Sequence, residues 1–174
     1  FTVNGMGIKL AFKEDGSVHG QVADYVGGLE DLNNKVLRAI GDPVKRFDES
    51  LDRIVRGIRF AVTKDLKIEP KTYNAMKSVI KGNDELGIIP AYERTLNGKY
   101  LISREVTGKN LAKAFHTDPA MTLFLLNDLG ALPYLMPELA KSVIPEDFVV
   151  DEKSQILHDD TKYRRKYFEL ACTN

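Results

Sequence analysis

The chain has 174 residues, of which 43% are hydrophobic and 29% are charged, and it contains 7 Pro and 13 Gly. This composition is typical of a globular protein and excludes a disordered or fibrous chain. Lys and Arg together number 25, as do Asp and Glu, so the formal net charge is zero. The overall charge therefore gives no indication of a nucleic-acid partner.

The cysteine count and the hydrophobic runs bear on the compartment. Cys172 is the only cysteine, so the chain cannot form an internal disulfide, and no CxxC or Cys/His spacing indicates zinc. No apolar run approaches the roughly 18 residues of a membrane span. We therefore expect a cytoplasmic protein without membrane contact.

The first forty residues have the pattern of β-strands. Residues 2–12 and 18–25 alternate between apolar and polar, and the turn residues 13–17 separate them, so the pattern predicts a hairpin. A third short strand is predicted at 36–40. Phe1 lies inside the expected first strand, and for this reason we expect the sequence to come from a longer protein.

From Pro43 onward the apolar spacing becomes helical. Apolar residues at 47, 51, 54, 58 and 61 predict one amphipathic helix, with Asp42 as its N-cap and Pro43 in its first turn. Further helices are predicted at 71–81, at 103–115 with Ser103 as its cap, at 119–129 with Asp118 as its cap, at 132–143 with an interruption near Pro137, and at 159–171. A short extended piece is predicted at 66–69. The fold class is therefore α+β, with short antiparallel strands followed by an all-helical remainder and a boundary near Gly41.

Three motifs in order carry a family resemblance. Residues 1–4 (F-T-V-N) are similar to the end of R-D-F-T-x-N, and residues 24–32 (D-Y-V-G-G-L-E-D-L) resemble D-x-x-G-G-x-x-D-L. Residues 41–61 resemble G-D-P-x-x-R-F-x-E-D-x-x-R-x-x-R-x-x-R-F-A, with some ten matches and no gap. The sequence thus resembles the class II nucleotidyltransferases, which include CCA-adding enzymes and bacterial poly(A) polymerases. Weaker similarity continues to about residue 140.

The resemblance implies a division into three parts and an activity. Residues 1–41 would be the C-terminal part of a nucleotidyltransferase head, 42–101 a helical neck with the nucleotide-selecting helix, and 102–174 a helical body that binds RNA. The implied activity is template-independent addition of CMP or AMP, from CTP or ATP, to the 3′ end of tRNA. Poly(A) addition to another RNA 3′ end, or a non-catalytic RNA-binding module that kept the fold, are the alternatives.

The family's Mg²⁺ is held by an Asp-x-Asp pair, and this sequence contains no such pair in the corresponding region. We expect the metal to be bound by residues outside these 174, so that the chain alone binds nucleotide poorly and catalyses nothing. Asp24 and Asp31 are expected to be structural, because a glycine turn separates them and no third ligand accompanies them.

On a continuous helix from Pro43 to Ala61, the charged residues would lie opposite the buried stripe. A guanidinium is a planar fork of donors that matches phosphate oxygens or a base edge. The resemblance implies that Arg53 reads the base, that Arg56 and Arg59 support it, and that Glu49 orients Arg53. It extends nucleotide contact to Asn4 and to Ser50, which replaces the family's base-reading Asp and carries no charge, so that discrimination is weaker.

Without the resemblance, Glu49 and Arg53 would be interpreted as a surface ion pair of about 0.5 kcal/mol at most. Phe60 lies among the charges on this helix, where we expect it to pack on a neighbouring element or under a guanidinium. RNA phosphates are predicted to contact basic residues of the later helices. These residues are Lys109, Lys113, Arg164 and Arg165.

Overall fold

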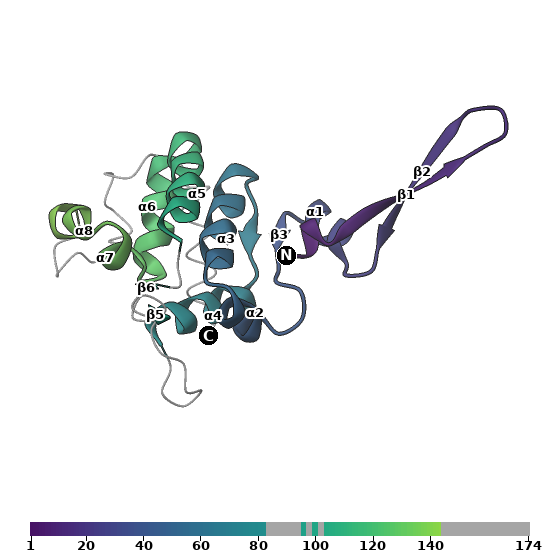
Figure 1. Cartoon of the computed structure of the whole chain (residues 1–174). Helices are drawn as coiled ribbons and strands as arrows, with labels where there is room; N and C mark the ends of the chain where they lie inside the picture. The colour runs from purple at the N-terminus through teal and green to yellow at the C-terminus, as the bar shows by residue number, and fades with distance from the viewer. Residues whose placement is uncertain (83–94, 97–98, 101–102, 144–174) are drawn as a thin grey trace.

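The computed structural model describes residues 1–82, 95–96, 99–100 and 103–143. An antiparallel hairpin comes first and the rest of the chain is mostly helical, so the predicted α+β class is confirmed. Figure 1 shows the hairpin projecting away from the helices, with the short helix α1 at its base. Within these ranges, no helix has the length and apolar character needed to cross a membrane.

The hairpin consists of β1 (Met6–Phe12) and β2 (Val18–Asp24). The predicted pairing is confirmed, with Ile8 opposite Val22 and Phe12 opposite Val18. The first strand begins later than predicted, because residues Thr2–Asn4 form a short 3₁₀ helix, η1. The prediction that Phe1 lies in a strand is therefore wrong.

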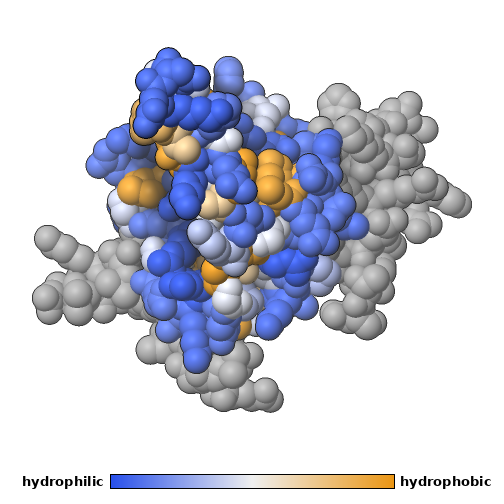
Figure 2. All heavy atoms as spheres, turned by 90° about the vertical axis from the view of Figure 1, so that its right-hand side faces the viewer, coloured by the Kyte–Doolittle hydropathy of each residue, from blue (hydrophilic) through white to orange (hydrophobic). Residues whose placement is uncertain are grey.

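One face of the hairpin exposes apolar side chains. Ile8, Leu10 and Phe12 alternate along β1 and are 70%, 55% and 77% exposed. Val22 and Val18 lie opposite Ile8 and Phe12 and are about half exposed. In Figure 2, which views the molecule from the hairpin side, apolar patches interrupt a mainly hydrophilic surface. The ribbon is therefore held chiefly by its backbone ladder, because the described residues do not cover this apolar face.

The glycine motif after β2 builds the short helix α1 (Gly28–Asn33). Gly27 has a φ of 74°, a conformation that side chains disfavour. A Cβ on Gly28 would lie 2.4 Å from the carbonyl oxygen of Thr2, so only glycine fits there. The Asp24 carboxylate accepts hydrogen bonds from the backbone N–H groups of residues 26, 28 and 29, and these bonds lower its pKa. This half of the motif is architectural.

The second aspartate of the motif joins the N-terminal segment to the helices. Asp31 is buried, and its Oδ2 accepts a hydrogen bond of 2.7 Å from the Thr2 hydroxyl. Arg38 donates to both oxygens of Asp31 and lies 3.7 Å from the carboxylate of Glu69. Beside these side chains, β3 (Val36–Leu37) and β4 (Lys67–Ile68) form a two-stranded parallel sheet. Its backbone hydrogen bonds join the segment after α1 to the segment between α3 and α4.

The predicted continuous helix from Pro43 is wrong: the structure has two helices, α2 (Pro43–Glu49) and α3 (Asp52–Thr63). Ser50 between them is extended, with φ −155° and ψ 102°. The predicted cap is correct, since the Asp42 side chain accepts from the N–H groups of residues 44 and 45. Because α2 packs on α4 whereas α3 packs on α5 and α6, the break lets the two segments cover different neighbours.

The remaining helices follow the predicted order. They are α4 (Pro70–Lys81), α5 (Arg104–Thr117), α6 (Pro119–Asp128), α7 (Leu132–Leu135) and α8 (Pro137–Val143), and β5 (Thr95–Leu96) pairs with β6 (Lys99–Tyr100). Ser103 and Asp118 cap α5 and α6 as predicted, by accepting from backbone N–H groups. The helix predicted at 159–171 lies outside the described residues.

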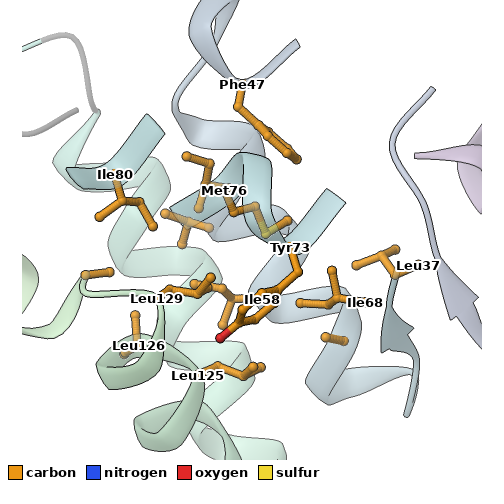
Figure 3. Close-up of a cluster of buried hydrophobic side chains, with 14 of the residues drawn as sticks. Leu37, Phe47, Ile58, Ile68, Tyr73, Met76, Ile80, Leu125, Leu126 and Leu129 are labelled. Carbon is orange, nitrogen blue, oxygen red and sulfur yellow. The ribbon is translucent and has the colours of Figure 1, made fainter. Parts of the chain in front are cut away.

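The core fills the space between these helices. Figure 3 shows side chains from α2, α3, α4, α6 and the β3–β4 pair converging on one cluster. Its largest fully buried members include Phe47, Leu37, Ile58, Ile68, Met76, Ile80, Leu125, Leu126 and Leu129. Helix α3 approaches α4 closely at Gly57, because a Cβ at this position would lie 2.4 Å from the methyl group of Met76 in α4.

Asp128 at the end of α6 leads to a pH-dependent prediction. Burial raises its pKa above the ordinary value, and Lys77 is no nearer than 4.0 Å. The folded state therefore binds a proton more readily than the unfolded state, and stability falls as the pH rises through the two pKa values. A carboxylate near a helix C-terminus is also unfavourable.

We expect Asp128→Asn to raise the thermal unfolding midpoint at about pH 7 and to have almost no effect near pH 3, where the carboxyl is protonated in both states. Calorimetry at the two pH values measures this difference. A variant that is less stable at neutral pH would show that the contact with Lys77 outweighs the desolvation of Asp128.

Candidate functional site

A pocket of about 210 Å³ opens where Phe1, the segment that follows β3 and the two helices α2 and α3 meet. Its lining combines three arginines with aromatic and aliphatic side chains. The lining residues are Phe1, Ala39, Ile40, Arg46, Phe47, Arg53 and Arg56. The pocket thus joins segments that are up to 55 positions apart in the sequence, from residue 1 to residue 56.

One carboxylate holds two of the arginines. Arg53 Nη1 lies 2.8 Å from Oε2 of Glu49, and Arg46 Nη1 lies 3.3 Å from the same oxygen. Arg53 also donates to the backbone carbonyl of Arg46, across the break between α2 and α3. The hydrogen bonds from Arg53 and then Arg46 lower the pKa of Glu49, so this carboxylate stays ionised. The three arginines outnumber it, and the pocket rim is positively charged.

Aromatic rings form the wall behind these cations. The Phe1 ring lies 6.2 Å from that of Phe47, tilted by 45°, and 6.2 Å from that of Phe60 in an edge-to-face arrangement. Arg59 lies over the Phe60 ring at 4.4 Å from its centroid, and Arg56 is 6.0 Å away. Phe60 therefore both packs on a neighbouring segment and lies under a guanidinium, as predicted.

This arrangement suits a flat, polar, anionic ligand. Guanidinium groups donate to phosphate oxygens or to ring nitrogens, and an aromatic wall accepts the face of a base. Pockets that enclose a whole small-molecule ligand usually measure roughly 300–1,000 Å³. The pocket described by these residues is smaller, so it has room for part of a nucleotide.

Several curated proteins are similar to this chain in sequence. CCA-adding enzymes from Streptococcus suis (strain 05ZYH33), Lactobacillus helveticus and Pediococcus pentosaceus are 46%, 41% and 43% identical to this chain over 76, 86 and 96 residues. Part of this chain is homologous to CCA-adding enzymes. The three matches cover 44%, 49% and 55% of this chain and 17%, 18% and 21% of the relatives. The chain thus spans about a fifth of the length of the curated CCA-adding enzymes it matches. No protein-family model matches the chain.

The residues that the resemblance predicted to contact nucleotide do not all line this pocket. Arg53 and Arg56 line the pocket, and Glu49 holds Arg53 from outside it. Ser50 lies at the break between α2 and α3, and Asn4 is exposed at the end of η1; neither is among the lining residues.

Arg59 does not join its two neighbours, because it lines a separate pocket between α3 and α5. Lys113 lines that second pocket as well, whereas Lys109 pairs with Glu105 on the exposed face of α5. Arg164 and Arg165, the other predicted RNA contacts, lie outside the described residues.

Of the seven residues that line the pocket, the sequence predicted Arg53 and Arg56 as site residues and missed the other five. Arg46 belongs to the same motif as Arg53, but its partnership with Glu49 depends on the short α2 helix. Phe1 was predicted only as the start of a strand, and Ile40 as the end of one. The available signal was that residues 1–4 and 41–61 both match motifs of one family. This match indicates that the two segments contribute to the same site.

Proposed function

We propose that the pocket binds ATP or CTP and that the intact protein adds CMP or AMP to the 3′ end of an RNA, as part of a longer nucleotidyltransferase. The observation that carries this proposal is the convergence of Arg46, Arg53 and Arg56 on an aromatic-walled pocket. The homology to CCA-adding enzymes supports tRNA as the RNA.

Arg53 is our candidate for reading the base. Adenine and cytosine both present an amino donor beside an acceptor ring nitrogen, and a guanidinium donates to that nitrogen without a template. The bond to Glu49 restricts the orientation of Arg53, so less conformational freedom is lost on binding. Arg46 and Arg56 then add positive charge for the phosphates.

Phosphoryl transfer to a hydroxyl requires a divalent metal such as Mg²⁺, which activates the attacking oxygen and neutralises the leaving pyrophosphate. The described residues do not fit this ion. They contain no group of three or more His, Cys, Asp or Glu able to hold a metal, and the Asp24 and Asp31 carboxylates are engaged by backbone N–H groups and by Thr2 and Arg38. No step of the proposal therefore passes through a metal held by these residues.

Nucleotide titration of the ¹⁵N-labelled chain, followed by NMR, tests the proposal. The Nε–H signals of arginine side chains report ligand contact even when binding is weak. We expect ATP or CTP to shift the signals of Arg46, Arg53 and Arg56, with smaller shifts for GTP, whose base lacks the amino donor beside an acceptor nitrogen at that edge. Poly(A) polymerase activity predicts a response to ATP alone. Unchanged arginine signals with all three nucleotides would contradict the proposal.

A further inference from the structure

The second pocket is a groove of about 520 Å³ between α3 and α5. The end of α3 contributes Arg59, Thr63 and Lys64, and the end of α5 contributes Lys113, His116 and Thr117. Phe60 reaches the groove from the side of the first pocket. Three permanent cations, a histidine and two hydroxyl side chains thus surround one opening.

Among the described residues, no carboxylate forms an ion pair with the basic groups of the groove. The Nε atom of Arg59 is buried and has no hydrogen-bond partner, although its guanidinium lies over the Phe60 ring. Lys64, Lys113 and His116 are exposed. Within the described part of the chain, the groove therefore carries positive charge that an anion can neutralise.

We infer that this groove binds the phosphate backbone of a single-stranded RNA end. A cationic groove with an aromatic side chain at its edge is the arrangement by which proteins hold single strands, with lysine and arginine on phosphates and a ring against a base. The volume exceeds that of the nucleotide pocket, and the basic side chains come from two helices, which suits an extended chain of phosphates better than a single one.

The aromatic wall connects the two pockets. Phe1 lines the nucleotide pocket and Phe60 lines the groove, and their ring centroids are 6.2 Å apart. Arg56 and Arg59 lie on the two sides of this division, each near the Phe60 ring. An RNA strand in the groove would thus bring its end beside the nucleotide. The choice of RNA rests on the proposed function; the presence of an anion site does not.

Fluorescence anisotropy with a labelled RNA hairpin carrying a single-stranded 3′ overhang tests this inference. We expect the Lys64→Ala/Lys113→Ala double variant of the full chain to bind the RNA about tenfold more weakly and to lower the slope of log K against log salt by about one to two. A blunt-ended hairpin should bind weakly to both proteins and show little difference. Lys71→Ala, which removes an exposed lysine on α4 outside the groove, is the matched control and should change affinity less than twofold.

Unchanged RNA affinity in the double variant, or an equal loss in Lys71→Ala, would overturn the inference. Lysines near helix C-termini also stabilise the helices, so a Lys64→Gln/Lys113→Gln variant with an unchanged melting temperature provides a second test. The nucleotide titration separates the two proposals. If the lysine variant loses RNA affinity while no nucleotide shifts the Arg53 signal, the groove is supported and the nucleotide pocket is refuted. If nucleotides shift the Arg53 signal while the lysine variant keeps its RNA affinity, the nucleotide pocket is supported and the groove is refuted.

Discussion

The Arg53→Ala variant is expected to bind ATP or CTP at least about tenfold more weakly than the unmodified chain, because hydrogen bonds to charged groups contribute about 1.5–3 kcal/mol. Arg53 lines the pocket, and its guanidinium is fixed by Glu49 and by the backbone carbonyl of Arg46. Removing it also leaves Glu49 with Arg46 as its remaining partner, so the negative charge beside an anionic ligand is less well compensated. NMR titration or calorimetry with each nucleotide gives the dissociation constants.

Two further variants show whether the loss of affinity comes from the hydrogen-bonding geometry of Arg53 or from its charge alone. Arg53→Lys keeps the charge but loses the planar fork, so affinity for the phosphates should be partly retained while the preference for particular bases declines. Lys45→Ala removes an exposed cation of α2 that does not line the pocket, and it should leave binding unchanged. Equal losses for Lys45→Ala and Arg53→Ala would mean that only the general positive field attracts the nucleotide.

The second large effect is expected at Phe47, which lines the pocket. We expect Phe47→Ala to destabilise the folded chain by about 3–5 kcal/mol, the usual cost of deleting a buried phenyl ring. Phe47 is 1% exposed and belongs to the core cluster, while its ring also contacts Phe1 in the pocket wall. The loss should therefore lower both the stability and the affinity for nucleotide.

Phe12→Ala is the matched control, because the same ring is removed from a side chain that is 77% exposed on the hairpin. Its effect on the free energy of unfolding should stay within about 0.5 kcal/mol. Urea unfolding followed by circular dichroism compares the two variants. If Phe12→Ala proved as destabilising as Phe47→Ala, the apolar face of the hairpin would have to be covered in solution, contrary to the structure.

Local sequence signals accounted for most of the elements. Asp42, Ser103 and Asp118 each stand before a helix and accept hydrogen bonds from its first N–H groups, which is chemistry that a sequence shows directly. Strand alternation likewise predicted the hairpin, because the ladder joins neighbouring segments across a five-residue turn. The start of β1 was misplaced because Thr2 makes a long-range bond to Asp31, which no local pattern records.

The site was only partly accessible to the same reasoning. The motifs predicted Arg53 and Arg56 as nucleotide contacts, and both line the pocket. The spacing of Glu49 and Arg53 correctly implied that the two side chains meet. The prediction of one continuous helix did not anticipate the break at Ser50. In the structure, the short helix α2 brings Arg46 to the carboxylate of Glu49, which Arg53 also contacts. Nor could that prediction divide Arg59 from Arg56, since the position of α5 decides which pocket Arg59 enters.

The amino-acid sequence by itself determined the α+β class, the helix caps, the glycine turn and the presence of a row of arginines after Pro43. These depend on backbone preferences and on contacts within a few residues. Only the tertiary structure decided where the row bends and which cations face one opening. Phe47 of α2 and Ile54 and Ile58 of α3 are buried in one core, yet α2 packs on α4 whereas α3 packs on α5 and α6. No interaction within the segment itself specifies those neighbours.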